Sequence, residues 1–178
     1  EHFLPGSMVN GFNCSYMTVS QSEELLTQKV GAYVLTIDTR NNGQESITAK
    51  QAGLSYDSDG SVDKLIRNQD RFTWFLAFNQ HRNYEVSSSI KYDEQKTEAA
   101  ISELKCMQQE NMTEPSDAHI EEKDDKFVIV PEQEGTALKP EKTSQDIIDA
   151  LVTGRTPVDL EADGCYKEPK VYQSDETL

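Results

Sequence analysis

The chain has 178 residues, and its 32 acidic residues against 17 basic ones give a formal charge of −15. A surface this acidic repels phosphate backbones, which argues against nucleic-acid binding. The apolar runs are too short to span a membrane, although a hydrophobic content of 35% allows a buried core. The chain begins without a basic leader or an apolar signal core, so we interpret it as an excised soluble piece of a longer protein.

Residues 1–80 are predicted to form an N-terminal α+β sub-unit. Hydrophobic periodicity and turn residues predict, in chain order, a strand over 8–14, a helix over 18–30, a strand pair over 33–37 and 45–48, and a helix over 61–69. The first helix begins with a capping box, formed by Thr18 with Gln21 or by Ser20 with Glu23.

The turn Asp57-Ser58-Asp59-Gly60 resembles the start of a calcium-binding loop. An EF-hand also needs a glutamate at its twelfth position, where this chain has Asn68. We therefore interpret the segment as a turn that caps the helix after it, and we predict no metal site.

The most aromatic segment is Arg71–Phe78, which reads RFTWFLAF. Phe72, Trp74 and Phe75 could form a surface on which sugar rings stack. The alternative is a hydrophobic plug between two sub-units, which is the more usual role of aromatic side chains. The polar residues 79–83 that follow are predicted to be the boundary between the sub-units.

Residues 84–172 are predicted to form a C-terminal α+β sub-unit, followed by a linker tail over residues 173–178. The expected elements are a long strand over 84–92, a helix capped by Asp93, two strands around the turn Asp124-Asp125, a helix from Pro140 to Gly154, and a strand over 156–160. Val128 to Val130 is apolar on both faces, which predicts a central strand. The expected fold is α+β, with antiparallel sheets, helices on one face and two closely packed sub-units.

Three cysteines, Cys14, Cys106 and Cys165, match no zinc pattern and include no CxxC pair. We predict a structural disulfide between Cys106 and Cys165 in an oxidising compartment, with Cys14 as a small buried residue in the first strand. The alternative is three reduced thiols.

The sequence contains no recognisable catalytic motif. His2, His81 and His119 stand apart from any cysteine or serine in a nucleophile pattern, and no P-loop or dinucleotide fingerprint occurs. Adjacent carboxylates are common in a chain this acidic, so they do not indicate acid–base chemistry. The sequence therefore predicts no cofactor and no catalytic residue.

The stretch from Asp117 to Leu160 has the clearest order of strands, turns and helix. Its characteristic residues are Asp117-Ala118, Lys126 to Glu132, Glu134-Gly135, Ala150-Leu151, Gly154 and Val158 to Leu160, preceded by His2 to Gly6 and Val9-Asn10-Gly11 near the start. In these residues the chain resembles the peptidoglycan-binding domain of Gram-positive L,D-transpeptidases and related VanW-type surface proteins. Cys14 and Tyr16 depart from the valine and glycine that are usual in that family.

The resemblance implies an extracellular, cell-surface location, with the parent protein anchored in the cytoplasmic membrane of a Gram-positive bacterium through a segment absent from this chain. The implied partner is peptidoglycan or another cell-wall polymer. In the transpeptidases a catalytic domain with an SxGC cysteine follows, and Cys165 lacks that serine. The chain is therefore expected to be a non-catalytic module that positions such a domain at the wall. The alternative is a surface stalk or adhesion module without affinity for wall polymers.

Overall fold

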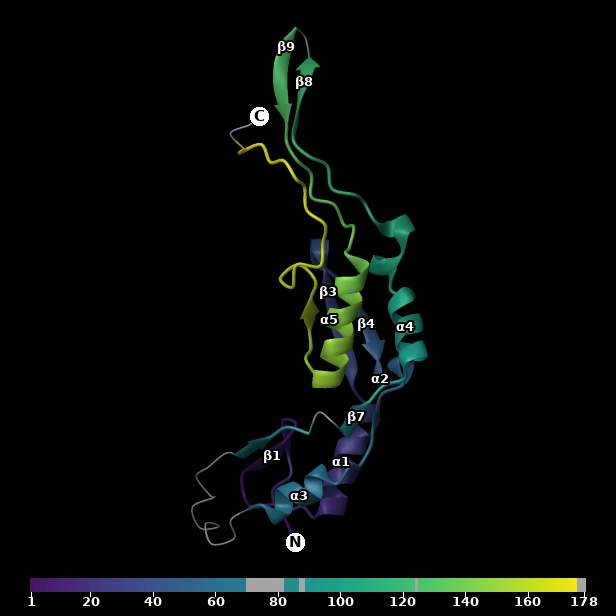
Figure 1. Ribbon diagram of the computed structural model, residues 1–178, viewed down its shortest axis with the longest axis vertical. Coiled ribbons are helices and arrows are strands. Elements are labelled where there is room, and N and C mark those ends of the chain that lie inside the picture. Colours follow the sequence, from purple (N-terminus) through teal and green to yellow (C-terminus); the bar gives the residue numbers. More distant parts are fainter. Residues whose placement is uncertain (70–81, 87–88, 124, 176–178) are drawn as a thin grey trace. The chain divides into compact units, whose positions relative to one another are not determined.

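The computed structural model describes residues 1–69, 82–86, 89–123 and 125–175, and it confirms a mixed α+β fold (Figure 1). Two compact units are each assembled from separate stretches of chain. Unit 1 comprises Glu1–Val34, Thr48–Thr97 and Leu151–Gly154, and unit 2 comprises Leu35–Ile47, Glu98–Ala150 and Arg155–Leu178. The boundary predicted at residues 79–83 lies partly outside the described residues, and the division into sub-units 1–80 and 84–172 stays a prediction. None of the helices in the described ranges is long and apolar enough to cross a bilayer.

Unit 1 consists of short strands and helices around an apolar core. Its elements are β1 (Ser7–Val9), β2 (Phe12–Asn13), α1 (Val19–Gly31), α2 (Ala49–Ala52), β5 (Ser55–Tyr56), α3 (Ser61–Arg67), β6 (Arg82–Tyr84) and β7 (Ile90–Lys91). The strand orders are β2-β1-β6 and β5-β7, and β1 runs parallel to β6. The core contains Phe3, Val9, Cys14, Leu26, Val62, Ile66 and Val86.

Local sequence explains how α1 and α3 begin. The hydroxyl of Thr18 accepts a hydrogen bond from the Gln21 amide, and the Gln21 side chain bonds back to the Thr18 amide, which confirms the predicted capping box. Before α3, the carboxylate of Asp59 accepts hydrogen bonds from the Ser61 amide and the Ser89 hydroxyl. The segment that resembles a calcium loop is therefore a turn leading into a helix.

The long strand predicted over residues 84–92 is wrong. The chain leaves β6 at Tyr84, the amide of Val86 donates to the side chain of Asn10, and the amide of Ser89 closes a turn onto the Val86 carbonyl. Because Val86 turns into the core, its backbone bonds to a side chain instead of to a neighbouring strand.

The remaining elements lie wholly or mainly in unit 2, although the first residues of β3 and α4 and the last residues of β4 and α5 belong to unit 1. These are β3 (Val34–Thr39), η1 (Arg40–Asn42), β4 (Gly43–Thr48), α4 (Glu94–Ser102), η5 (Lys105–Met107), η6 (Gln109–Asn111), β8 (His119–Lys123), β9 (Lys126–Val130), α5 (Pro140–Thr153) and β10 (Val158–Asp159). One sheet has the order β10-β3-β4, and Val158 of β10 pairs with Ile37 in parallel register. The predicted helix from Pro140 is confirmed, and the sheets contain the expected antiparallel pairs β1–β2, β5–β7 and β8–β9. Two further pairs, β1–β6 and β10–β3, run parallel.

The predicted hairpin is confirmed as β8 and β9, which pair in antiparallel register from His119 with Val130 to Lys123 with Lys126. The prediction that Val128 to Val130 lies in a central strand is wrong. The sheet holds only β8 and β9 among the described residues, and Phe127 and Ile129 are 79% and 51% exposed. A strand that is apolar on both faces is typically buried on both faces, but no element among the described residues covers β9.

Cys14, Cys106 and Cys165 are free thiols in this structure, and the disulfide between Cys106 and Cys165 stays a prediction. The thiol of Cys165 donates to Asp146 of α5 at 3.2 Å, whereas the amide of Cys106 donates to Glu45 at 2.8 Å. Burial, with the neighbouring carboxylate of Glu45, raises the pKa of Cys106 to about 12. Burial and Asp146 raise the pKa of Cys165 to about 11. Each thiol therefore has a carboxylate beside it, and neither is activated as a nucleophile.

Candidate ligand-binding groove

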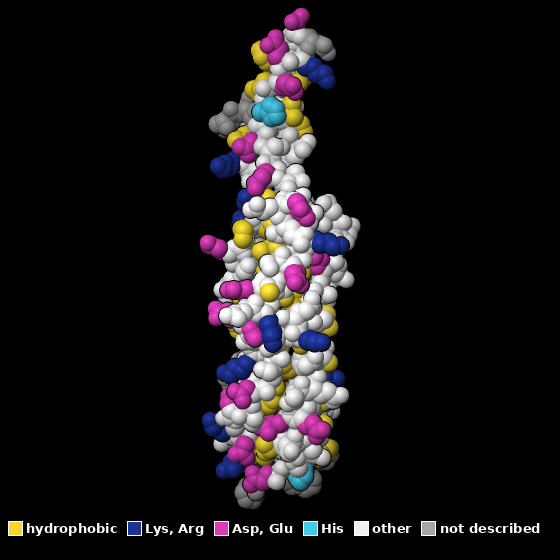
Figure 2. Space-filling model, turned by 90° about the vertical axis from the view of Figure 1, so that its right-hand side faces the viewer, with side chains coloured by type: hydrophobic (Ala, Val, Ile, Leu, Met, Phe, Trp, Pro, Cys, Tyr) yellow, Lys and Arg dark blue, Asp and Glu magenta, His cyan; other side chains and the backbone are white. Residues whose placement is uncertain are grey.

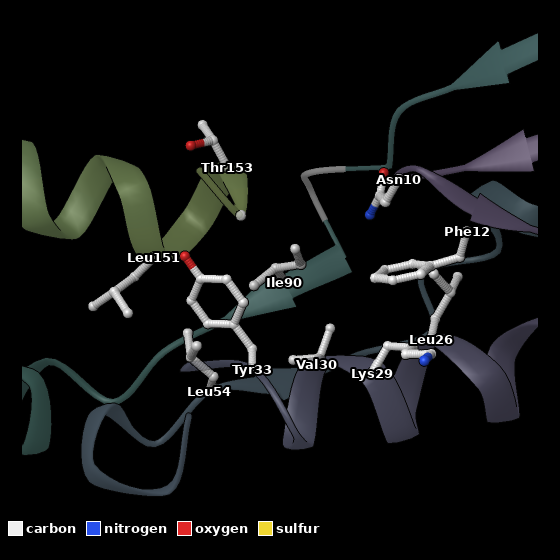
Figure 3. A pocket seen from close by; sticks show the side chains of 11 residues that line it. Asn10, Phe12, Leu26, Lys29, Val30, Tyr33, Leu54, Ile90, Leu151 and Thr153 are labelled. Carbon is white, nitrogen blue, oxygen red and sulfur yellow. The ribbon is translucent and has the colours of Figure 1, made fainter. Parts of the chain in front are cut away.

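Unit 1 contains a small pocket of about 110 Å³ with an apolar floor (Figure 3). Its lining comes from five segments of the chain. These contribute Asn10 and Phe12; Leu26, Lys29 and Val30 of α1 with Tyr33; Leu54; Ile90; and Leu151 and Thr153 of α5 with the following Gly154. The pocket therefore depends on the fold of unit 1, which brings these segments together.

The turn between β1 and β2 positions Asn10 and Phe12. Asn10 and Gly11 have φ angles of 48° and 78°, in the left-handed region that Gly and Asn tolerate best. The Asn10 amide donates to the Tyr84 carbonyl at 2.8 Å, and the Asn10 side-chain oxygen accepts from the Val86 amide at 2.8 Å. Because these bonds hold both ends of the residue, the Asn10 side-chain nitrogen points toward the pocket (Figure 3).

Helix α1 supplies both the floor and a positive charge. Leu26 and Val30 are buried one turn apart, whereas Lys29 between them is exposed at the edge of the pocket. The ammonium nitrogen of Lys29 lies 5.6 Å from the centroid of the Phe12 ring, within the range of a cation–π contact. The Phe12 ring therefore helps to hold a cation at the edge of an apolar floor.

The opposite side of the pocket is formed by Tyr33, Leu54 and Ile90. The Tyr33 carbonyl accepts from the amide of Ala49 at 2.8 Å, and the Leu54 amide donates to the carbonyl of the same Ala49. Ile90 pairs with Tyr56 in the β5-β7 sheet. Backbone hydrogen bonds on each of these segments make this side a preformed surface.

A second hollow of about 570 Å³ adjoins the pocket and shares Asn10, Ile90 and Thr153 with it. Its other lining residues are Gly11, Asn83, Tyr84, Glu85 and Val152. We call the two hollows together the unit 1 groove. Lys29 lines the first hollow and Glu85 lines the second, and the side-chain amide of Asn10 lies where the two hollows meet.

The described lining of the unit 1 groove is largely apolar, with a few polar and charged side chains. Among its described lining residues, no histidine, cysteine or serine is present to serve as a base or nucleophile, and the charged side chains are Lys29 and Glu85. Apolar walls with a few fixed polar groups are typical of a recognition site. Nowhere in the described ranges do three or more His, Cys, Asp or Glu side chains gather to hold a metal ion.

The stacking residues proposed from the sequence, Phe72, Trp74 and Phe75, lie outside the described residues, so their role stays a prediction. The sequence did not indicate Phe12, Lys29 or Tyr33 as site residues. The local signal nearby was the turn dipeptide Asn10-Gly11, which predicts a bend but not what the bend faces.

A family model with the description "Putative peptidoglycan binding domain" matches residues 45–159. The matched range includes Leu54, Ile90 and Thr153 of the groove, whereas Asn10 and Lys29 precede it. No curated protein and no solved structure matches the chain. Because the family model covers more than half of its length, the chain belongs to the peptidoglycan-binding domain family.

Proposed function

We propose that this chain is a non-catalytic, extracellular module that binds peptidoglycan through the unit 1 groove and positions an L,D-transpeptidase-like catalytic domain at the cell wall. Family membership supports a cell-wall polymer as the ligand. The observation that carries the choice of site is the pairing of Lys29 with the Phe12 ring at the edge of an apolar floor.

The chemistry of the polymer matches the groove. Peptidoglycan combines sugar rings with short peptides that carry both free carboxylates and free amines. A carboxylate can approach the Lys29 ammonium, a peptide carbonyl can accept from the side-chain NH2 of Asn10, and an amine can approach Glu85. The small apolar pocket is of a size to receive a side chain as small as that of alanine, while the larger hollow is open enough for the polymer backbone.

Cosedimentation with purified sacculi tests the proposal. The Lys29→Ala variant is expected to weaken binding about three- to tenfold, as for the loss of one charge-assisted contact at an exposed site. The matched control is Lys64→Ala, which removes the same charge from an exposed position on α3 of the same unit, outside the groove.

Equal loss of binding in Lys29→Ala and Lys64→Ala would show that the attraction is a general charge effect and that the groove is not the site. Complete absence of the wild-type chain from the pellet, at low salt and with or without divalent cations, would instead favour a stalk or adhesion module without wall affinity.

A further inference from the structure

The β8–β9 hairpin of unit 2 exposes several large hydrophobic side chains to solvent. It extends away from β3, β4 and α5 of the same unit (Figure 1). Figure 2 shows hydrophobic side chains on its surface among acidic ones. Ile120, Phe127, Val128 and Ile129 are all exposed, with Phe127 the most exposed of the four. Exposed apolar residues on a sheet with open edges typically mark an interaction surface.

The two edges of the hairpin differ in charge. The centre of β8 consists of Ile120, Glu121 and Glu122, so its edge carries two adjacent carboxylates. The centre of β9 consists of Phe127, Val128 and Ile129, without a charge. Charged residues on an edge strand prevent another strand from adding to it, so β8 is protected and β9 is not.

The backbone of β9 is arranged to pair at its outer edge. Lys123 and Lys126 pair across a loop of two residues, which makes them a hydrogen-bonded pair. Alternation along the ladder then places the N–H and C=O groups of Phe127 and Ile129 on the outer edge. Among the described residues, no strand other than β8 pairs with β9.

We propose that two copies of this chain associate by antiparallel pairing of their β9 edges, which forms a four-stranded sheet with Val128 on the two-fold axis. In this register Phe127 of one copy lies opposite Ile129 of the other, and the outer N–H and C=O groups of each bond to those of its partner. The same face of the sheet then carries Phe127, Ile129 and Ile120 from both copies as an apolar centre, with Glu122 beside each Phe127 at its margin.

Charge complementarity selects a second copy as the occupant and β9 as the edge. Gln133 pairs with Ser116 in the same register as the hairpin, so Glu132 lies on the face of Lys126 and Val128. In the symmetric β9 pair, Lys126 of one copy lies diagonal to Glu132 of the other, within reach of an ion pair. The corresponding β8 pair would place Glu121 opposite Glu121 of the second copy, which repels.

Sedimentation equilibrium of the whole chain over a wide concentration range tests the proposal. The wild type is expected to show weak, reversible dimerisation, because a five-residue edge buries a small area. Ile129→Pro removes an outer N–H of β9 and is expected to raise the dissociation constant about tenfold or more. The matched control is Ile120→Pro, because Ile120 of β8 pairs directly with Ile129. This variant removes an outer N–H of β8 and is expected to leave the dissociation constant unchanged.

A second pair of variants avoids any effect of proline on folding. Val128→Glu is expected to be monomeric, since two carboxylates would meet at the two-fold axis, and mixing it with Val128→Lys is expected to restore association as a heterodimer. A wild-type chain that stays monomeric at the highest concentrations overturns the proposal. Equal effects of Ile129→Pro and Ile120→Pro also overturn it, as does a mixture that fails to associate. Sacculus binding is measured on the same variants, so a failure here is distinct from a failure of the unit 1 groove.

Discussion

Arg40 stacks on Tyr166 in unit 2, with its guanidinium carbon 4.3 Å from the ring centroid, while its backbone amide donates to the Tyr166 hydroxyl at 2.8 Å. The same guanidinium forms two hydrogen bonds to Glu161 and one to the carbonyl of Gly135. The Arg40 side chain is only 11% exposed. One side chain therefore ties the end of β3 to two loops that come more than 90 residues later in the chain.

We predict that Arg40→Lys lowers the free energy of unfolding by about 1–3 kcal/mol. Lysine keeps the charge but cannot make the two-pronged bond to Glu161, the bond to Gly135 and the stack on Tyr166 at once. Urea unfolding measures the change. The control is Arg67→Lys, at an exposed ion pair with Asp63 within α3, where a change of under about 0.5 kcal/mol is expected. Equal losses in the two variants would contradict the role of Arg40.

The contribution of Glu161 to stability is expected to depend on pH. Its hydrogen bond to Arg40 holds the pKa of the Glu161 carboxyl below the ordinary value of 4.5. A carboxyl with a lowered folded-state pKa stabilises the fold above its unfolded pKa, and the stabilisation is lost as the pH falls through the folded pKa. The difference in unfolding free energy between wild type and Glu161→Gln should therefore be constant near neutrality and shrink below about pH 4.5. A difference that does not change with pH would contradict this.

The three thiols are expected to be free and slow to react. Burial beside carboxylates raises the pKa of Cys106 to about 12 and that of Cys165 to about 11, so little thiolate is present at pH 8. Intact mass after alkylation in urea, without reductant, should show three labels, and alkylation of the folded chain should be slower by orders of magnitude. A single label in urea would instead support the disulfide between Cys106 and Cys165.

Gly53 ends α2 in the left-handed conformation, with a φ of 63°. A Cβ added there would lie 2.6 Å from the Cβ of Asp93, so both strain and contact oppose a side chain. Gly53→Ala is expected to cost about 1–2 kcal/mol. The control is Gly31→Ala in the last turn of α1, where a Cβ meets no atom within 4 Å and a neutral or slightly stabilising change is expected. Thermal melts of the two variants compare them directly, and similar melting temperatures would contradict the prediction.

Much of the local structure could be predicted from the sequence, because its causes are local. Thr18 with Gln21 and Pro140 at the start of α5 act through neighbours a few residues away, and the structure confirms both. The structure also confirms the two predicted strands as the pair β8–β9. The family was also recognisable from the stretch after Asp117, because its turns and strands keep a characteristic order.

Only the tertiary structure decided which surfaces are covered and which residues meet. Val128 has the composition of a core residue and is exposed, because burial depends on whether another element covers the strand. Phe12, Lys29 and Ile90 meet in one groove although up to 78 residues separate them along the chain, and Arg40 meets Glu161 across 121 residues. Local propensity acts over one or two turns of chain, whereas a site is made by long-range packing, and a single sequence carries no local signal for that packing.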